Sequence, residues 1–83
     1  MEEELVTRNF AANLLGFYIH SAEFILWKAE NSSQEINHEQ MRKFRDNYQF
    51  YLEKCRGVIE EEEARVHENT IGRLEQYFEI TDT

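Results

Sequence analysis

The sequence predicts an all-α fold, a bundle of three helices in a single domain spanning residues 1–83. Three observations support this prediction. The chain contains no proline and only three glycines, its apolar residues recur at helical spacing, and a short polar segment at residues 31–33 interrupts them. Eleven aromatic residues supply enough apolar surface for a core, so we expect a folded chain.

The first helix is expected at about residues 4–29 and is the most apolar part of the chain. Its polar residues form one narrow stripe, made of Asn9, Asn13, Gly16, His20 and Glu23. At about 100° per residue this stripe covers only a third of the helix circumference, whereas an ordinary surface helix has a wider polar side. The helix is therefore expected either at the centre of the bundle or in an interface between molecules.

A membrane span and a secretory signal are both disfavoured. Residues 10–29 have the length of a span, but His20 and Glu23 would lie near the centre of the bilayer, where charge is costly. The acidic start Met1–Glu4 differs from the basic start of a signal peptide, and the single Cys55 suits a reducing compartment. We therefore expect a cytoplasmic protein without a membrane segment.

The second helix is expected at about residues 38–56 and the third at about 58–79. Two capping residues compete for the start of the second helix, Ser32 and Asn37. Asn37 is favoured because Gln40 completes a capping box and because Ile36 and Met41 occupy the staple positions around it.

The apolar stripe changes sides between the second helix and the third. The second helix uses Met41, Phe44, Tyr48, Tyr51, Cys55 and Val58, and the third uses Ala64, His67, Ile71, Leu74 and Phe78. The two registers differ by two residues, which is about 200° on a helix. We favour a break with Gly57 as a left-handed helix end, so that the second and third helices pack antiparallel. The alternative is one long helix over residues 38–79 in an intertwined dimer.

The charge is unevenly distributed. Seventeen acidic and nine basic residues give a net charge of −8, which disfavours direct binding to nucleic acid. Residues 42–57 carry a net charge of +3 and residues 58–83 carry −6, so the two helices are expected to complement each other. An alternative is that the acidic run of Glu60, Glu61, Glu62 and Glu63 imitates a nucleic-acid backbone, as in phage-type anti-defence inhibitors. Four consecutive carboxylates point in all directions around a helix, which favours a solvated helix start.

Signals for catalysis or metal binding are weak. The sequence contains no phosphate-binding glycine loop, no H-E-x-x-H motif and no cysteine pair. One Glu-x-x-His motif, Glu35 to His38, is present, whereas helical di-metal sites use two. We therefore expect no catalytic residues, no metal site and no cofactor, and a metal-binding helical sensor or enzyme is kept as an alternative.

The remaining signals indicate a protein that acts by binding. The first helix has more apolar surface than two neighbouring helices can cover, which predicts a homodimer and an adaptor, regulator or inhibitor of another protein. Aromatic anchors are expected among Phe17, Phe24, Trp27, Tyr48, Tyr51, Tyr77 and Phe78. His67 lies at the centre of the third apolar stripe and is either a hydrogen-bonded core residue or a pH-sensitive contact.

Overall fold

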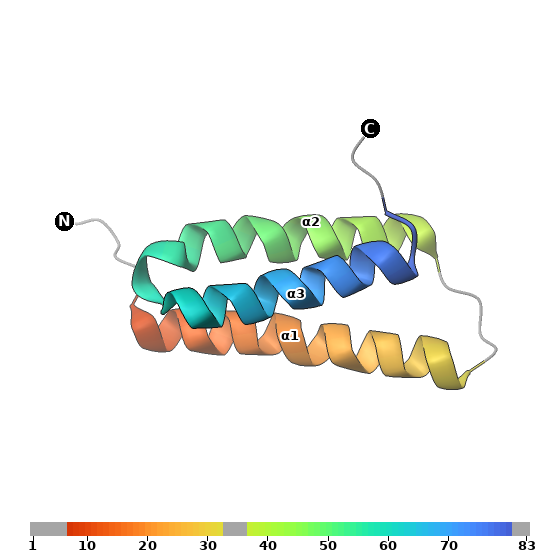
Figure 1. Cartoon of the computed structure of the whole chain (residues 1–83), viewed down its shortest axis with the longest axis horizontal. Helices are drawn as coiled ribbons and strands as arrows, with labels where there is room; N and C mark the ends of the chain where they lie inside the picture. The colour runs from red at the N-terminus through yellow and green to blue at the C-terminus, as the bar shows by residue number, and fades with distance from the viewer. Residues whose placement is uncertain (1–6, 33–36, 81–83) are drawn as a thin grey trace.

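Three α-helices pack side by side, and each runs antiparallel to the next along the chain (Figure 1). The computed structural model describes residues 7–32 and 37–80. Helix α1 spans Arg8–Asn31, α2 spans His38–Cys55 and α3 spans Glu61–Tyr77, with a short 3₁₀ turn, η1, at Arg56–Val58. The described residues form no strand, and the predicted all-α bundle of three helices is confirmed.

Helix α1 begins four residues later than the sequence predicts, because Thr7 caps it. The Thr7 side-chain oxygen accepts a hydrogen bond from the backbone N–H of Phe10 at 3.1 Å. Threonine satisfies in this way one of the N–H groups that lack a helical acceptor in the first turn. The inner side of the helix is lined by small and medium apolar residues, all buried: Ala11, Leu15, Ala22 and Leu26.

Helix α2 begins where the capping signal predicts. The Asn37 side-chain oxygen accepts hydrogen bonds from the backbone N–H groups of Glu39 at 2.9 Å and Gln40 at 3.1 Å. The buried side of α2 is centred on Tyr48, Leu52 and Cys55, and the remaining apolar residues of the predicted stripe are half-buried beside it. Asn37 is therefore confirmed as the cap.

The joint between α2 and α3 differs from the prediction. Gly57 lies inside the 3₁₀ turn, and none of the described glycines has a positive φ, so the left-handed Gly57 is wrong. Helix α3 begins at residue 61 instead of 58, after Glu60, whose backbone N–H donates to the Glu63 carboxylate at 3.1 Å as in a capping box. The alternative of one long helix over residues 38–79 is also wrong, because Ile59 and Glu60 have extended backbone.

Helix α3 ends in a left-handed residue, although that residue is not glycine. Glu79 has φ 55°, and the backbone N–H of Ile80 donates to the carbonyl of Glu75 at 2.9 Å. This is the hydrogen bond of a Schellman motif. Ile80 is buried, so the chain folds back onto the core directly after the helix.

The core lies along the axis of the bundle and contains Tyr48 and Phe78. Tyr48 is fully buried and Phe78 is 3% exposed, so in this fold both are core residues and neither offers a surface to another molecule. Their inclusion among the predicted partner-binding residues is corrected accordingly. The remaining buried apolar residues of α3 and its end are Ala64, Ile71, Leu74 and Ile80.

Ion pairs join the basic α2 to the acidic α3. Buried Arg45 contacts the Glu75 carboxylate at 2.7 Å, and Arg56, directly after α2, contacts Glu68 at 2.7 Å and Glu53 at 2.7 Å. The predicted complementarity of these two segments is thus present within one chain. Its main effect is to fix the orientation of α3 against α2.

Candidate functional site

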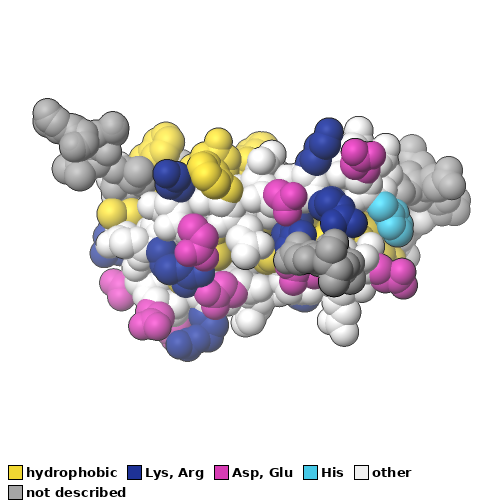
Figure 2. Space-filling model, turned by 90° about the horizontal axis from the view of Figure 1, so that it is seen from above, with side chains coloured by type: hydrophobic (Ala, Val, Ile, Leu, Met, Phe, Trp, Pro, Cys, Tyr) yellow, Lys and Arg dark blue, Asp and Glu magenta, His cyan; other side chains and the backbone are white. Residues whose placement is uncertain are grey.

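Large aromatic side chains lie exposed along one side of α1. Phe10, Phe17 and Phe24 follow one another at seven-residue intervals, and Trp27 and, on α2, Phe50 lie exposed as well. All five are between 54% and 64% exposed. We call these five residues the aromatic face. In Figure 2, hydrophobic side chains gather at one edge of the surface seen from above, while charged side chains cover much of the rest.

The position of the aromatic face follows from the helical repeat. Residues at 10, 17 and 24 are separated by roughly 140° from the buried line that runs through Ala11, Leu15 and Ala22. One helix therefore has two apolar sides, and the bundle covers only the inner one. Isolated exposed apolar residues are normal, but a row of large aromatics usually marks an interaction site.

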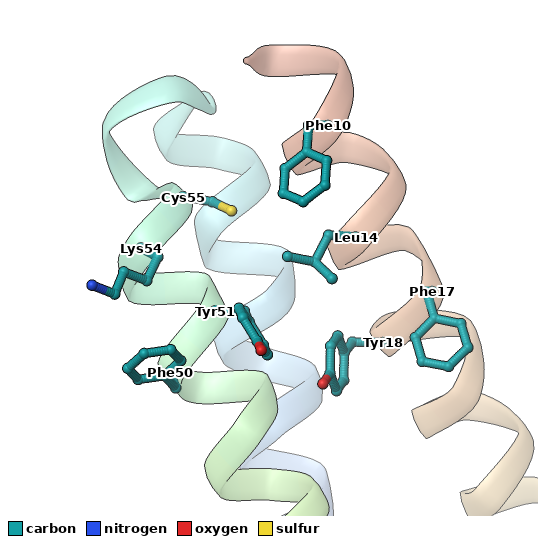
Figure 3. Close-up of a pocket in the computed structure, with 8 residues that line it drawn as sticks. All are labelled: Phe10, Leu14, Phe17, Tyr18, Phe50, Tyr51, Lys54 and Cys55. Carbon is teal, nitrogen blue, oxygen red and sulfur yellow. The ribbon is translucent and has the colours of Figure 1, made fainter. Parts of the chain in front are cut away.

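A groove of about 400 Å³ opens between α1 and α2 beside the aromatic face (Figure 3). Its α1 wall consists of Phe10, Leu14, Phe17 and Tyr18, and its α2 wall consists of Phe50, Tyr51, Lys54 and Cys55. Figure 3 shows Leu14 and the Cys55 sulfur directed into this space, while Lys54 extends away from α1. The groove is therefore apolar inside and has its charge at the rim.

An aromatic cluster fixes one end of the groove. The Tyr18 ring stacks on Tyr48 with 5.4 Å between centroids and also contacts Phe44 at 5.4 Å and Tyr51 at 5.7 Å. Each such pair stabilises the packing beyond the area it buries. Since Tyr48 belongs to the core, this cluster attaches the groove to the rigid part of the bundle.

Cations flank the aromatic face. The Lys28 ammonium lies 5.8 Å from the centroid of Phe24, and that of Lys54 lies 5.3 Å from Phe50. Among the described residues that line the groove, none is a carboxylate. A partner segment that enters the groove therefore meets apolar rings and, at the edge, positive charge.

The structure distributes the predicted anchors over three environments. Phe17, Phe24 and Trp27 lie exposed on α1, and the rings of Phe24 and Trp27 stack at 6.3 Å. Tyr51 is half-buried in the groove wall. Tyr77 is exposed on α3, where it lines a hollow together with Leu26 and Glu30 of α1.

Two members of the aromatic face, Phe10 and Phe50, are absent from the predicted anchors. Phe10 stands seven residues before Phe17, so the regular spacing of the exposed phenylalanines could have revealed it. Phe50 precedes a residue of the apolar stripe of α2, and no periodicity distinguishes it. Only the packing of α2 against α1 places it beside the groove.

His67 lies in the core between α2 and α3. It is 9% exposed, and its Nδ1 shares a hydrogen bond of 2.6 Å with the Tyr48 hydroxyl. Burial lowers the pKa of His67, while the nearby Glu63 carboxylate acts in the opposite direction. Burial, together with the charge of Glu23, also raises the pKa of Tyr48, so the phenol keeps its proton.

The acidic run lies at the start of α3. Glu61, Glu62 and Glu63 form the first turn, where carboxylates stabilise the positive end of the helix dipole. Arg8 of α1 lies 3.8 Å from the Glu60 carboxylate. These contacts give the run a function within the fold, and imitation of nucleic acid stays a prediction.

The polar residues with metal-binding chemistry are dispersed. In the described ranges 7–32 and 37–80, no three His, Cys, Asp or Glu side chains gather into a group suited to a metal ion. His20 and Glu23 lie 3.9 Å apart on the outer side of α1, and Glu35 lies outside the described residues. Burial raises the pKa of the Cys55 thiol, which favours its protonated, less nucleophilic form.

Two further findings complete the description of the chain. None of the helices in the described part of the chain has the length and apolar character needed to cross a bilayer. A comparison of the sequence with models of protein families, with curated proteins and with solved structures finds no match.

Proposed function

We propose that this chain is a small, non-enzymatic protein-interaction module that acts sterically through its aromatic face. The observation that supports this most directly is the row of Phe10, Phe17 and Phe24, each more than half exposed on a helix whose other side is already buried. Aromatic residues dominate the binding energy of many interfaces because they bury a large area with few rotatable bonds.

The surroundings of the aromatic face fit a helical partner. The groove beside it runs between two helices, and its walls carry phenylalanine, leucine and tyrosine side chains. Amphipathic helices bind in apolar grooves of this kind through residues spaced three and four apart. We propose that the bound segment is helical. It belongs either to a second copy of this chain, which gives a homodimer, or to a different protein.

Photo-crosslinking tests this function. A photoreactive phenylalanine analogue replaces Phe17 in the full chain, and the same analogue replaces Val66, which is also half exposed but lies on α3. We expect position 17 to form covalent adducts with a discrete protein in the cells that produce the chain, and position 66 to form far fewer. The mass of the adduct distinguishes a second copy of this 10.1 kDa chain from another protein. Equal, diffuse labelling from both positions would contradict the proposal.

A further inference from the structure

We propose that the aromatic face takes the α1 helix of a second copy of this chain, packed antiparallel, with Phe24 of each copy seated in the groove of the other. This inference rests on the proposed function and names the partner. It is supported by the spacing of six exposed or half-buried residues along one side of α1, which we call the seam: Phe10, Leu14, Phe17, Ser21, Phe24 and Lys28.

The seam has the repeat of a coiled coil. Its residues alternate in steps of four and three, which is the spacing that keeps one side of a helix against a partner helix when the two coil around each other. It extends over most of α1 and ends near the C-terminus of the helix. A partner helix must therefore be long and must have the same repeat, and a second α1 meets both conditions.

The order of large and small residues along the seam selects the antiparallel orientation. When two α1 helices run in opposite directions about a point near residue 19, Phe17 lies opposite Ser21, Leu14 opposite Phe24, and Phe10 opposite Lys28. Each layer then pairs a large ring with a smaller or flexible side chain. In the parallel orientation every phenylalanine would meet its own copy, and Lys28 would meet Lys28, which is repulsive.

The same register fills the groove. Leu14 lies between Phe10 and Phe17 in the α1 wall of the groove, so its opposite residue, Phe24 of the second copy, enters the apolar space between α1 and α2. Lys28, which already lies 5.8 Å from an aromatic centroid within its own chain, reaches Phe10 of the second copy. That contact is a cation–π pair of the same kind.

Charge and area favour a second copy. Two chains that each carry a net charge of −8 repel each other. The seam and the residues that line the groove include no carboxylate, so two copies that meet there experience the least repulsion. If an aromatic side chain has roughly 200 Å² to bury, the exposed parts of the five rings of the aromatic face amount to roughly 580 Å² per copy. When all five rings are covered in both copies, about 1,160 Å² leaves solvent, which exceeds the ~1,000 Å² expected of a specific interface.

Disulfide trapping tests the register. In a Cys55→Ala background, Phe17→Cys and Ser21→Cys are made as separate full-length chains, mixed and oxidised. We expect a disulfide between residue 17 of one chain and residue 21 of the other, and at least tenfold less dimer from either variant alone. Efficient crosslinking of Ser21→Cys with itself would show a parallel pair and would overturn the proposal.

A steric variant tests the same contact without cysteine. Ser21→Phe places a ring where Phe17 of the second copy must fit, so we expect its dimer to dissociate at least tenfold more readily than that of the wild type in sedimentation. Val66→Phe is the matched control, because it adds the same ring at an exposed position of α3 and should remain dimeric, and circular dichroism verifies that both variants are helical. A wild-type chain that sediments as a ~10 kDa monomer at 100 µM would overturn the antiparallel pair. If position 17 then still crosslinks to a different protein, the interaction module itself stands.

Discussion

Burial of His67 makes the stability of the fold depend on pH. The imidazole shares a hydrogen bond with the Tyr48 hydroxyl, and burial lowers the pKa of His67 below the ordinary value of 6.5. Between the lowered pKa and 6.5 the unfolded chain binds more protons than the folded chain, so stability is complete above about pH 7 and decreases as the pH falls through this range. We expect the free energy of unfolding to decrease by at most about 1.4 kcal/mol per pH unit.

Urea unfolding between pH 5.5 and 8 measures this dependence. The variant His67→Gln keeps a side-chain oxygen that can accept from Tyr48 but does not titrate, so its unfolding free energy should vary less with pH than that of the wild type. His20→Gln is the control, because it makes the same substitution at an exposed histidine. If the unfolding free energies of the wild type and His67→Gln varied identically with pH, His67 would not be the source of the pH dependence.

Glu79 stores backbone strain at the end of α3. Its φ of 55° lies in the left-handed region, which disfavours side chains with a Cβ and suits glycine. Glu79→Gly should therefore stabilise the protein by about 1 kcal/mol, measured as a higher urea midpoint. Glu79→Ala removes the carboxylate but keeps the Cβ. If this variant raised the urea midpoint as much as Glu79→Gly, the gain in stability would result from the loss of charge and not from the relief of backbone strain.

At the scale of the elements, the joint between α2 and α3 is open to a direct test at Gly57. Its backbone is not left-handed, and a Cβ built at this position meets no described atom within 4 Å. Gly57→Ala should therefore raise the free energy of unfolding by about 0.5–1 kcal/mol, because alanine restricts the unfolded chain. If Gly57 were left-handed, the substitution would lower the free energy of unfolding instead. Thermal unfolding of Gly57→Ala therefore distinguishes the two backbone conformations.

The helices themselves could be predicted because local rules determine them. Helical spacing of apolar residues indicates three helices, and Asn37 has the hydrogen-bonding oxygen that a helix start requires. The start of α3 could not be placed as well. Glycine at residue 57 resembles a helix end, whereas the chain continues in a 3₁₀ turn and uses Glu60 and Glu63 for the cap.

The candidate site could be predicted only in part. Periodicity identifies apolar sides but does not say which neighbour covers each side, so Tyr48 and Phe78 looked equivalent to Phe17 and Phe24. Their burial depends on contacts between α2, α3 and α1, which are distant in sequence. Phe50 was missed for the same reason, since its exposure beside the groove results from tertiary packing.

At the scale of the whole molecule, a folded dimer should make thermal stability depend on concentration. Because association favours the folded state by mass action, the midpoint of thermal unfolding should rise as the chain concentration increases from 1 to 100 µM. Phe24→Ala removes the side chain that enters the groove, so its midpoint should hardly depend on concentration. Tyr77→Ala removes an exposed aromatic of α3 and should behave like the wild type.

The buried thiol of Cys55 gives the molecule a built-in reporter. Its sulfur is directed into the groove, so an alkylating reagent must enter the same space that a bound helix would fill. The rate of alkylation should therefore fall as the chain concentration rises, and Phe24→Ala should restore the faster rate. Mass spectrometry measures how fast the chain is alkylated. Protection of the Cys55 sulfur from alkylation then measures the occupancy of the groove.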